Sequence, residues 1–216
     1  MTGELGSAVT GSPNLNLTTG TLGSGVTGGS GLTNVPKDAT KVASGAFSAV
    51  DTIDIQGCFT SDYKFYKLYL GGYSRDAYIR IGYLNESGSH LTSTYYSQYI
   101  QFVSQDGSEG FTRWDNAATQ SIGAQQHANG FQPNNTWHQT GPNESSLLEM
   151  FFWNPLDTTT LNPVRWQSQW SGGSYLGWNM GSGLQDSTVA KHGLRFGGNA
   201  NAFRATGHFA VYGYKV

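Results

Sequence analysis

Charged side chains are scarce in this chain, and their scarcity excludes several classes of partner. Lys, Arg, Asp and Glu make up 12% of the 216 residues, about half of the quarter that is usual in soluble domains. The formal net charge is −2 and there is no run of Lys or Arg, so the sequence predicts no surface for the phosphates of a nucleic acid. Hydration must come from Ser, Thr, Asn, Gln and Gly, a composition typical of secreted and particle-borne β proteins.

Cysteine and long apolar runs are also nearly absent. The single cysteine, Cys58, excludes an intramolecular disulfide and a cysteine-built metal site, and we expect it to be a small buried apolar side chain. No stretch approaches the roughly 18 apolar residues of a membrane-spanning helix, so no membrane insertion is expected. The first residues, MTGELGSAVTGSPN, have neither the basic start nor the apolar segment of a classical export signal. We therefore expect a protein that is made in the cytoplasm and exported, if at all, without a signal peptide.

Recognisable catalytic motifs are missing as well. The sequence has no nucleophile elbow, no His-Glu-x-x-His helix, no phosphate-binding glycine loop and no EF-hand loop. The carboxylates of Asp106, Glu109 and Asp115 cluster in sequence and could supply an acid pair for glycan cleavage, but Asp106 and Asp115 are each followed by a residue favoured in turns. The dispersed histidines show no spacing typical of a metal site; they are His90, His127, His138, His192 and His208. We predict no catalytic residue, no metal and no cofactor.

The N-terminal region has a composition of its own. Residues 1–35 consist almost entirely of Gly, Ser, Thr, Leu, Val and Asn, with a loose repeat in LTTGTLGSGVTGGSGLTNV. One copy buries too little apolar area to offset its backbone entropy, which favours a mobile linker. Three copies wound around one axis could instead bury the isolated Leu and Val side chains, because glycine permits close approach. On either interpretation, residues 1–40 are an arm for attachment or trimerisation, and residues 41–216 form the folded domain.

Short aromatic or β-branched runs, broken by Gly, Asn, Asp and Ser, follow this arm. Their period is often two: Trp166 and Trp170 share one face of a predicted strand, while Arg165 and Gln167 share the other. Ser93–Val103 has aromatic residues at helical offsets, but its content suits a strand as well. We predict strands at Ala46–Ile55, Tyr63–Leu70, Ala77–Leu84, Tyr99–Val103, Leu147–Trp153, Val164–Trp170, Tyr175–Met180, Val189–Phe196 and His208–Tyr214. Such spacing indicates an all-β protein with an antiparallel sandwich or barrel.

The final residues, 193–216, are the most informative stretch of the chain. We interpret GLRFGGNANAFRATGHFAVYGYKV as a β-ribbon, with a short strand Gly193–Phe196, a Gly- and Asn-rich connector and a strand that runs to the end. Its pattern of Phe209, Val211 and Tyr212 before a glycine resembles the closing hairpin of jelly-roll domains in tail fibres and other virion proteins of bacteriophages. The phrase NLNLTTGTLGSGVTGGSGL in the arm resembles the repetitive threads by which phage fibre proteins attach or trimerise. This resemblance implies an antiparallel jelly-roll-like β-sandwich behind an extended arm.

Aromatic residues, 13% of the chain, supply the candidate binding residues. Trp114 and Trp137 lie in polar, loop-like stretches, whereas the other four tryptophans lie in predicted strands and are expected in the core. An indole ring stacks on the apolar face of a sugar while neighbouring polar groups bind its hydroxyls, although the same residues also anchor protein interfaces or pack in cores. We predict a glycan-binding site that comprises Trp114, Asp115, Asn116, Trp137, His138 and Gln139.

The resemblance to phage proteins implies a structural protein located in the virion, and not an enzyme. We expect a homotrimeric tail or receptor-binding fibre that attaches to other virion proteins by its N-terminal arm. Its sandwich would present loops to a host surface glycan. A head decoration or cement protein, which would clamp neighbouring capsomers, is the alternative among virion proteins. A small glycan-active enzyme and a lectin-like module are the alternatives from other classes.

Overall fold

The computed structural model describes residues 39–48, 50–72, 79–105, 108–114, 125–127, 130–133, 145–172, 175–197 and 207–215. All of these residues belong to the unit Ala39–Val216. The arm predicted for residues 1–40 lies almost entirely outside the described residues, so its role stays a prediction.

Every regular element among the described residues is a β-strand. The strands are β1 (Ala39–Phe47), β2 (Thr52–Ile55), β3 (Phe65–Gly71), β4 (Arg80–Leu84), β5 (Tyr95–Gln105), β6 (Ser108–Trp114), β7 (Gln125–His127), β8 (Ser145–Trp153), β9 (Pro163–Gly172), β10 (Tyr175–Gln185), β11 (Gly193–Gly197) and β12 (Gly207–Tyr214). The segment with helical offsets, Ser93–Val103, lies mostly in β5, because its aromatic and β-branched residues suit a pleated strand. The part of the chain that the structure describes contains no helix long and apolar enough to span a membrane.

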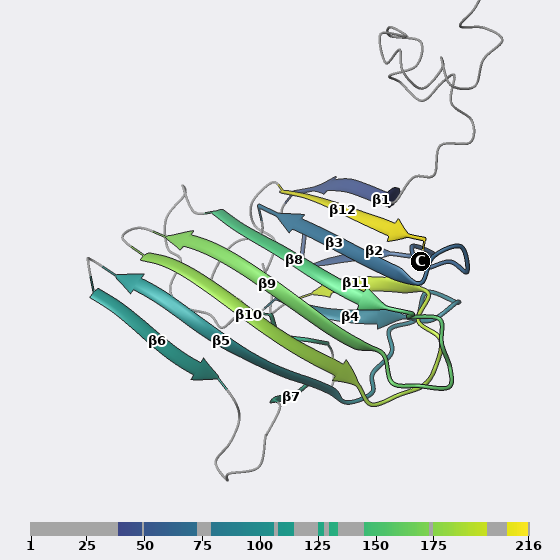
Figure 1. Ribbon diagram of the computed structural model, residues 1–216. Helices are drawn as coiled ribbons and strands as arrows, with labels where there is room; N and C mark the ends of the chain where they lie inside the picture. Colours follow the sequence, from purple (N-terminus) through teal and green to yellow (C-terminus); the bar gives the residue numbers. More distant parts are fainter. Residues whose placement is uncertain are drawn as a thin grey trace, which may run out of the picture. The chain divides into compact units, whose positions relative to one another are not determined.

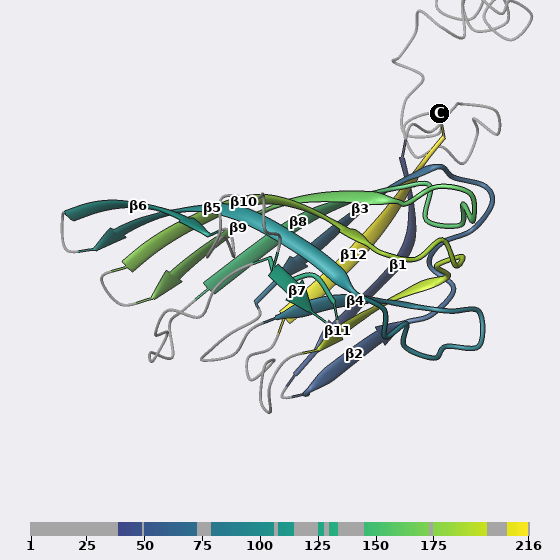
Figure 2. The ribbon, with the colours of Figure 1, turned by 90° about the horizontal axis from the view of Figure 1, so that it is seen from below.

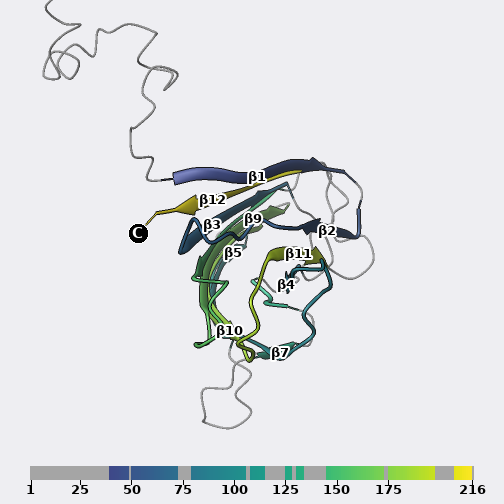
Figure 3. The same cartoon turned by 90° about the vertical axis from the view of Figure 1, so that its right-hand side faces the viewer.

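The strands form two antiparallel sheets (Figure 1). The large sheet has the order β1-β12-β3-β8-β9-β10-β5-β6, with β7 pairing with the first residues of β5, and the small sheet has the order β2-β11-β4. The small sheet lies against one face of the large sheet (Figures 2 and 3), so the two pack as a sandwich. The predicted all-β, antiparallel sandwich is confirmed, and its jelly-roll-like connectivity stays a prediction.

The C-terminal strands belong to different sheets, so the predicted ribbon is wrong. β11 pairs with β2 and β4 in the small sheet, whereas β12 pairs with β1 and β3 in the large sheet. Both strands were correctly predicted from their residue patterns. Residues 198–206 separate them, a connection far longer than a two-residue hairpin turn, so their closeness in sequence does not impose pairing.

The core lies between the two sheets and is built from alternate residues of their strands. Every second residue from Tyr66 to Leu70 in β3, and from Leu148 to Phe152 in β8, is fully buried. The small sheet meets these side chains with Ile55, Ile81, Tyr83, Leu194 and Phe196. Because successive strand residues point to opposite sides, the remaining residues of the large sheet face away from the small sheet. We call this second side the outer face.

Candidate binding site

The residues predicted to bind a glycan lie mostly outside the described residues. Asp115, Asn116, Trp137, His138 and Gln139 are not among them. Trp114 is the last residue of β6, and its main chain pairs with Tyr99 of β5. The predicted loop position of Trp114 is therefore a strand end, and the glycan site predicted around it stays a prediction.

The outer face of the large sheet exposes an unusual number of apolar side chains. In β9, Trp166, Ser168 and Trp170 are buried while Arg165 and Gln167 are exposed, which confirms the predicted period of two. Five large apolar side chains of the outer face are between 42% and 61% exposed, and they are Phe102, Leu147, Trp153, Leu176 and Met180. Exposed apolar side chains that gather on one face commonly mark a binding site.

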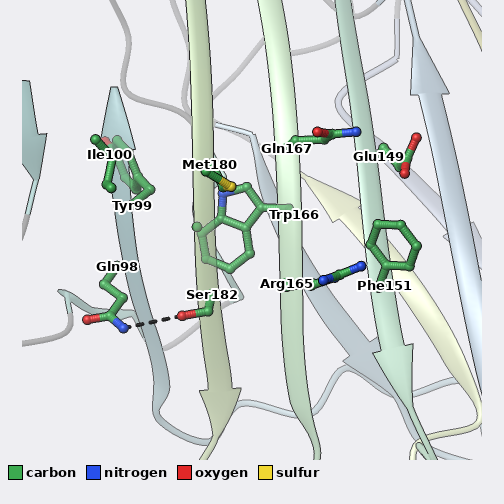
Figure 4. Close-up of a pocket in the computed structure, with 11 residues that line it drawn as sticks. Gln98, Tyr99, Ile100, Glu149, Phe151, Arg165, Trp166, Gln167, Met180 and Ser182 are labelled. Carbon is green, nitrogen blue, oxygen red and sulfur yellow. Dashed lines mark hydrogen bonds between the residues drawn. The ribbon is translucent and has the colours of Figure 1, made fainter. Parts of the chain in front are cut away.

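A groove of about 620 Å³ lies on the outer face, across β8, β9, β10 and β5 (Figure 4). Two cross-strand rows form its outer-face lining. The first row, in strand order, is Phe151, Arg165, Ser182 and Gln98, and the second is Glu149, Gln167, Met180 and Ile100. The groove also borders Tyr99, Trp166 and Gly181. Its volume lies within the range typical of small-molecule sites.

An ion pair lies at the β8 side of the groove. Lys67 Nζ lies 2.8 Å from Glu149 Oε1, and it also lies 4.7 Å from the ring centroid of Tyr69 and 4.9 Å from that of Phe151. Partial burial acts to lower the pKa of Lys67, but the hydrogen bond to Glu149 acts against it, and the pKa is raised above its ordinary value. Both charges are therefore satisfied within the protein.

Arg165 carries the second positive charge of the groove. Its guanidinium carbon lies 4.6 Å from the ring centroid of Phe151, a cation–π distance, and Figure 4 shows the two side chains next to each other on β9 and β8. No carboxylate among the described residues forms an ion pair with Arg165. The groove therefore holds one positive charge that the described residues leave uncompensated.

Amide and hydroxyl groups complete the groove. Gln98 Nε2 donates a hydrogen bond to Ser182 Oγ at 3.2 Å. Gln167 is exposed between Met180 and Glu149 in the second row, and its amide is directed toward the Glu149 side (Figure 4). Neither histidine nor cysteine lines the groove, and no three His, Cys, Asp or Glu residues in the described ranges come close enough to hold a metal ion. The arrangement suits a polar ligand with flat apolar parts.

A buried polar cluster lies on the opposite side of the same strands. Asn179 Nδ2 donates to Ser168 Oγ at 3.2 Å, and Ser168 Oγ donates to the carbonyl oxygen of Pro133 at 3.3 Å. The main-chain nitrogen of Gln132 donates to Ser97 Oγ at 3.2 Å. These bonds hold residues 130–133 against the large sheet, so the cluster has a structural role.

Lys191 is a second buried polar group with an unusual environment. Its Nζ donates to Asn162 Oδ1 at 2.6 Å and to the carbonyl oxygen of Ser187 at 2.8 Å. Burial lowers the pKa of Lys191 to about 8, partly opposed by the charge of Asp157. Hydrogen bonds from Thr159 and Thr160 in turn lower the pKa of Asp157 to about 2. Lys191 thus joins the segment after β8 to the segment after β10.

The groove residues were not identified from the sequence. The alternation in β9 does predict that Arg165 and Gln167 are exposed, and this was the one available signal. The strands beside β9 are β8 and β10. β10 pairs in turn with the whole length of β5, although these two strands lie far apart in the chain. A local pattern contains no information about such non-local pairing.

Comparisons with known proteins give no family for this chain. No protein-family model matches it, and no curated protein sequence matches it. Among solved structures, it is similar to the marine PL-14 alginate lyase from Aplysia kurodai, with 9% identity, 72% of this chain and 71% of that chain covered, and a TM-score of 0.25. It is also similar to an aerolysin-like protein from Bombina maxima, with 8% identity, 75% and 91% covered, and a TM-score of 0.14. At these TM-scores, neither similarity supports a conclusion about site or activity.

Proposed function

We propose that this chain is a structural protein of a tailed-phage virion, a homotrimeric tail or receptor-binding protein whose β-sandwich binds a host surface glycan. The resemblance of the arm sequence NLNLTTGTLGSGVTGGSGL to the repetitive threads of phage fibre proteins supports the virion location. The resemblance of residues 193–216 to a closing hairpin does not, because β11 and β12 lie in different sheets.

The groove on the outer face is the observation that carries the binding function. It combines the apolar side chains of Phe151, Met180 and Ile100 with the amides of Gln98 and Gln167 on one sheet face. Sugars are bound by apolar contact together with hydrogen bonds to their hydroxyls.

The composition of the groove favours binding over hydrolysis. Hydrolysis of a glycosidic bond ordinarily uses two carboxyl groups on opposite sides of the bond. Among the described residues, Glu149 is the one carboxylate that lines the groove, and Lys67 Nζ lies 2.8 Å from its Oε1. A protein that holds the glycan without cleaving it is therefore the better account of these residues.

The head decoration or cement protein is the second candidate, because exposed apolar side chains on the outer face extend beyond the groove. Phe102, Leu147 and Leu176 do not line the groove, yet they are strongly exposed. A broad apolar surface of this kind would suit packing on a capsid protein. Immunogold labelling of the particle distinguishes the two candidates, because a receptor-binding protein labels the tail and a decoration protein labels the head.

A titration of the full-length chain with a panel of oligosaccharides tests the binding function. We expect at least one oligosaccharide to bind and to be recovered with its length unchanged. Phe151→Ala should weaken that binding at least tenfold, whereas Trp153→Ala, which changes an aromatic residue of the same face outside the groove, should leave it within twofold. Cleaved oligosaccharide would favour the enzyme alternative. Binding that is insensitive to Phe151→Ala would place the glycan elsewhere, and no binding would reject the glycan function.

The predicted homotrimer is part of this proposal and has its own test. Low charge and aromatic-rich strands favour an assembly that covers apolar surface. Analytical ultracentrifugation at low micromolar concentration should give a single trimeric species. A monomer that persists at this concentration would contradict the proposed assembly.

A further inference from the structure

The charges in the groove indicate which glycans it selects. Lys67, Glu149 and Arg165 are the charged residues in or beside it. The ammonium of Lys67 and the carboxylate of Glu149 neutralise each other at 2.8 Å, and their side chains are less than one-fifth exposed. The exposed guanidinium of Arg165 has no carboxylate partner among the described residues. The groove therefore presents one net positive charge to a ligand.

Arg195, on the small sheet, offers a comparison, because its guanidinium binds a carboxylate within the protein. Its Nε and Nη2 donate to the two carboxylate oxygens of Asp54 at 2.7 Å and 2.6 Å. This is the two-point geometry with which a planar guanidinium binds a planar carboxylate. Arg165 has the same donors and, among the described residues, no such partner.

The contact with Phe151 holds the Arg165 side chain in place before a carboxylate binds. The guanidinium packs over the aromatic ring at 4.6 Å, which restricts the side chain while leaving N–H groups free to donate at its edge. Ser182 lies opposite Arg165 on β10 and is bonded to Gln98. Figure 4 shows the guanidinium directed toward Phe151, while Ser182 and Gln98 lie on the other side of Arg165, so a saccharide that spans the row could meet the cation at one end and amide and hydroxyl groups at the other.

We propose that the groove selects saccharides that carry a carboxylate, such as uronic or sialic acid residues, and that Arg165 binds this carboxylate through two parallel hydrogen bonds. The proposal rests on the glycan-binding function proposed above. Gln98 and Gln167 bind hydroxyls of the same saccharide, and Met180 contacts the apolar face of a sugar ring. A neutral glycan would leave the guanidinium without a partner, so it binds more weakly.

Isothermal titration calorimetry with matched pairs of ligands tests this selection. The probes are oligogalacturonate, a hyaluronan hexasaccharide and an oligosialate, each compared with its methyl ester, which keeps the sugar backbone and removes the charge. We expect at least one acid to bind at least tenfold more tightly than its ester, with an affinity that falls as salt concentration rises. Sulfated oligosaccharides test whether the groove selects a carboxylate or any anion, because a sulfate can also accept two hydrogen bonds from a guanidinium; sulfated sugars that bind as tightly as the preferred acid would contradict selection for a carboxylate.

Two variants assign the selection to Arg165. Arg165→Gln should remove the difference between acid and ester, while Arg165→Lys, which keeps the charge without the planar fork, should retain only part of it. Arg195→Gln changes net charge equally on the other sheet and should retain the full difference. Melting curves check that each variant is folded, and the exposure of Arg165 predicts little change for its variants.

The possible failures are distinguishable. If neutral or esterified glycans bind as tightly as the acids, or if Arg165→Gln keeps the preference for acids, the selection by Arg165 is refuted while the glycan-binding function stands. If acids, esters and neutral glycans all fail to bind, the proposed function itself is refuted, and the inference is refuted with it.

Discussion

The stability of the folded domain should increase between pH 7 and pH 9 because of Lys191. This side chain is fully buried, and its ammonium is bonded to Asn162 Oδ1 and to the carbonyl oxygen of Ser187. Burial lowers the pKa of Lys191 from 10.5 to about 8. Between these two values the unfolded chain binds more protons at this residue than the folded chain does. Proton linkage then requires the free energy of unfolding to rise with pH through this window.

The size of the effect follows from the two pKa values. The whole window from about 8 to 10.5 corresponds to about 3 kcal/mol, of which about 1 kcal/mol falls between pH 7 and pH 9. Cys58 acts in the opposite sense, because burial raises the pKa of its thiol from 9.0 to about 12. The unfolded thiol loses its proton first, so this contribution lowers stability as pH rises through about 9. By pH 9 half of the unfolded thiol is ionised, so Cys58 subtracts about 0.4 kcal/mol from the gain, equally in the wild type and in a variant of Lys191. The difference between the two proteins therefore isolates Lys191.

Urea denaturation of the wild type and of Lys191→Met at pH 7 and pH 9 measures this effect. The wild type should gain about 1 kcal/mol at the higher pH, whereas the variant, which keeps the length of the side chain but cannot titrate, should show only the small loss from Cys58. If the free energy of unfolding of the wild type stays constant or falls over this range, the buried environment assigned to Lys191 is wrong. An equal gain in the variant would show that another group is responsible.

Three further predictions concern the packing of the sandwich. Gly177→Ala should destabilise the domain by about 3 kcal/mol, because the new Cβ would overlap the indole of Trp170. Gly71→Ala, whose Cβ would meet its nearest neighbour at 3.8 Å, should be nearly neutral. Equal effects on thermal denaturation would contradict this packing. Cys58, buried with a raised pKa, should react with a thiol reagent at pH 8 only in denaturant, and rapid labelling of native protein would contradict its burial. Truncation before Gly207 removes β12 from between β1 and β3, exposing two strand edges, and should give insoluble protein; soluble, cooperatively unfolding material would show that β12 is peripheral.

Strand positions could be predicted from the sequence wherever one face of a strand is buried. The prediction Val164–Trp170 lies within β9, Pro163–Gly172, because alternate burial produces a period of two. β6 was missed, since SEGFTRW contains glycine and charged residues instead of an apolar alternation. β7 was also missed, because its three residues, Gln125–His127, are all polar. The single strand predicted at Ala46–Ile55 is also wrong, because this range contains the end of β1, Ala39–Phe47, and the separate strand β2, Thr52–Ile55, which lie in different sheets.

Strand partners and the groove could not be predicted in this way. The pairing of β11 with β2 and β4, instead of β12, depends on contacts between distant parts of the chain. The groove likewise requires β5 to lie next to β10, so that Gln98 and Ser182 come within 3.2 Å. From the sequence, binding is predicted in the loops around Trp114 and Trp137. Among the described residues, the groove lies instead on the outer face of the large sheet.

A crystal structure of the full-length chain with its tightest-binding oligosaccharide tests the central claim most directly. The proposed binding mode predicts electron density for the saccharide on the outer face, over Met180 and Ser182. A carboxylate should lie at the guanidinium of Arg165, and the glycosidic bonds should be intact. Saccharide bound anywhere else on the chain, or an outer face covered by another copy of the protein with no room for a ligand, would contradict it.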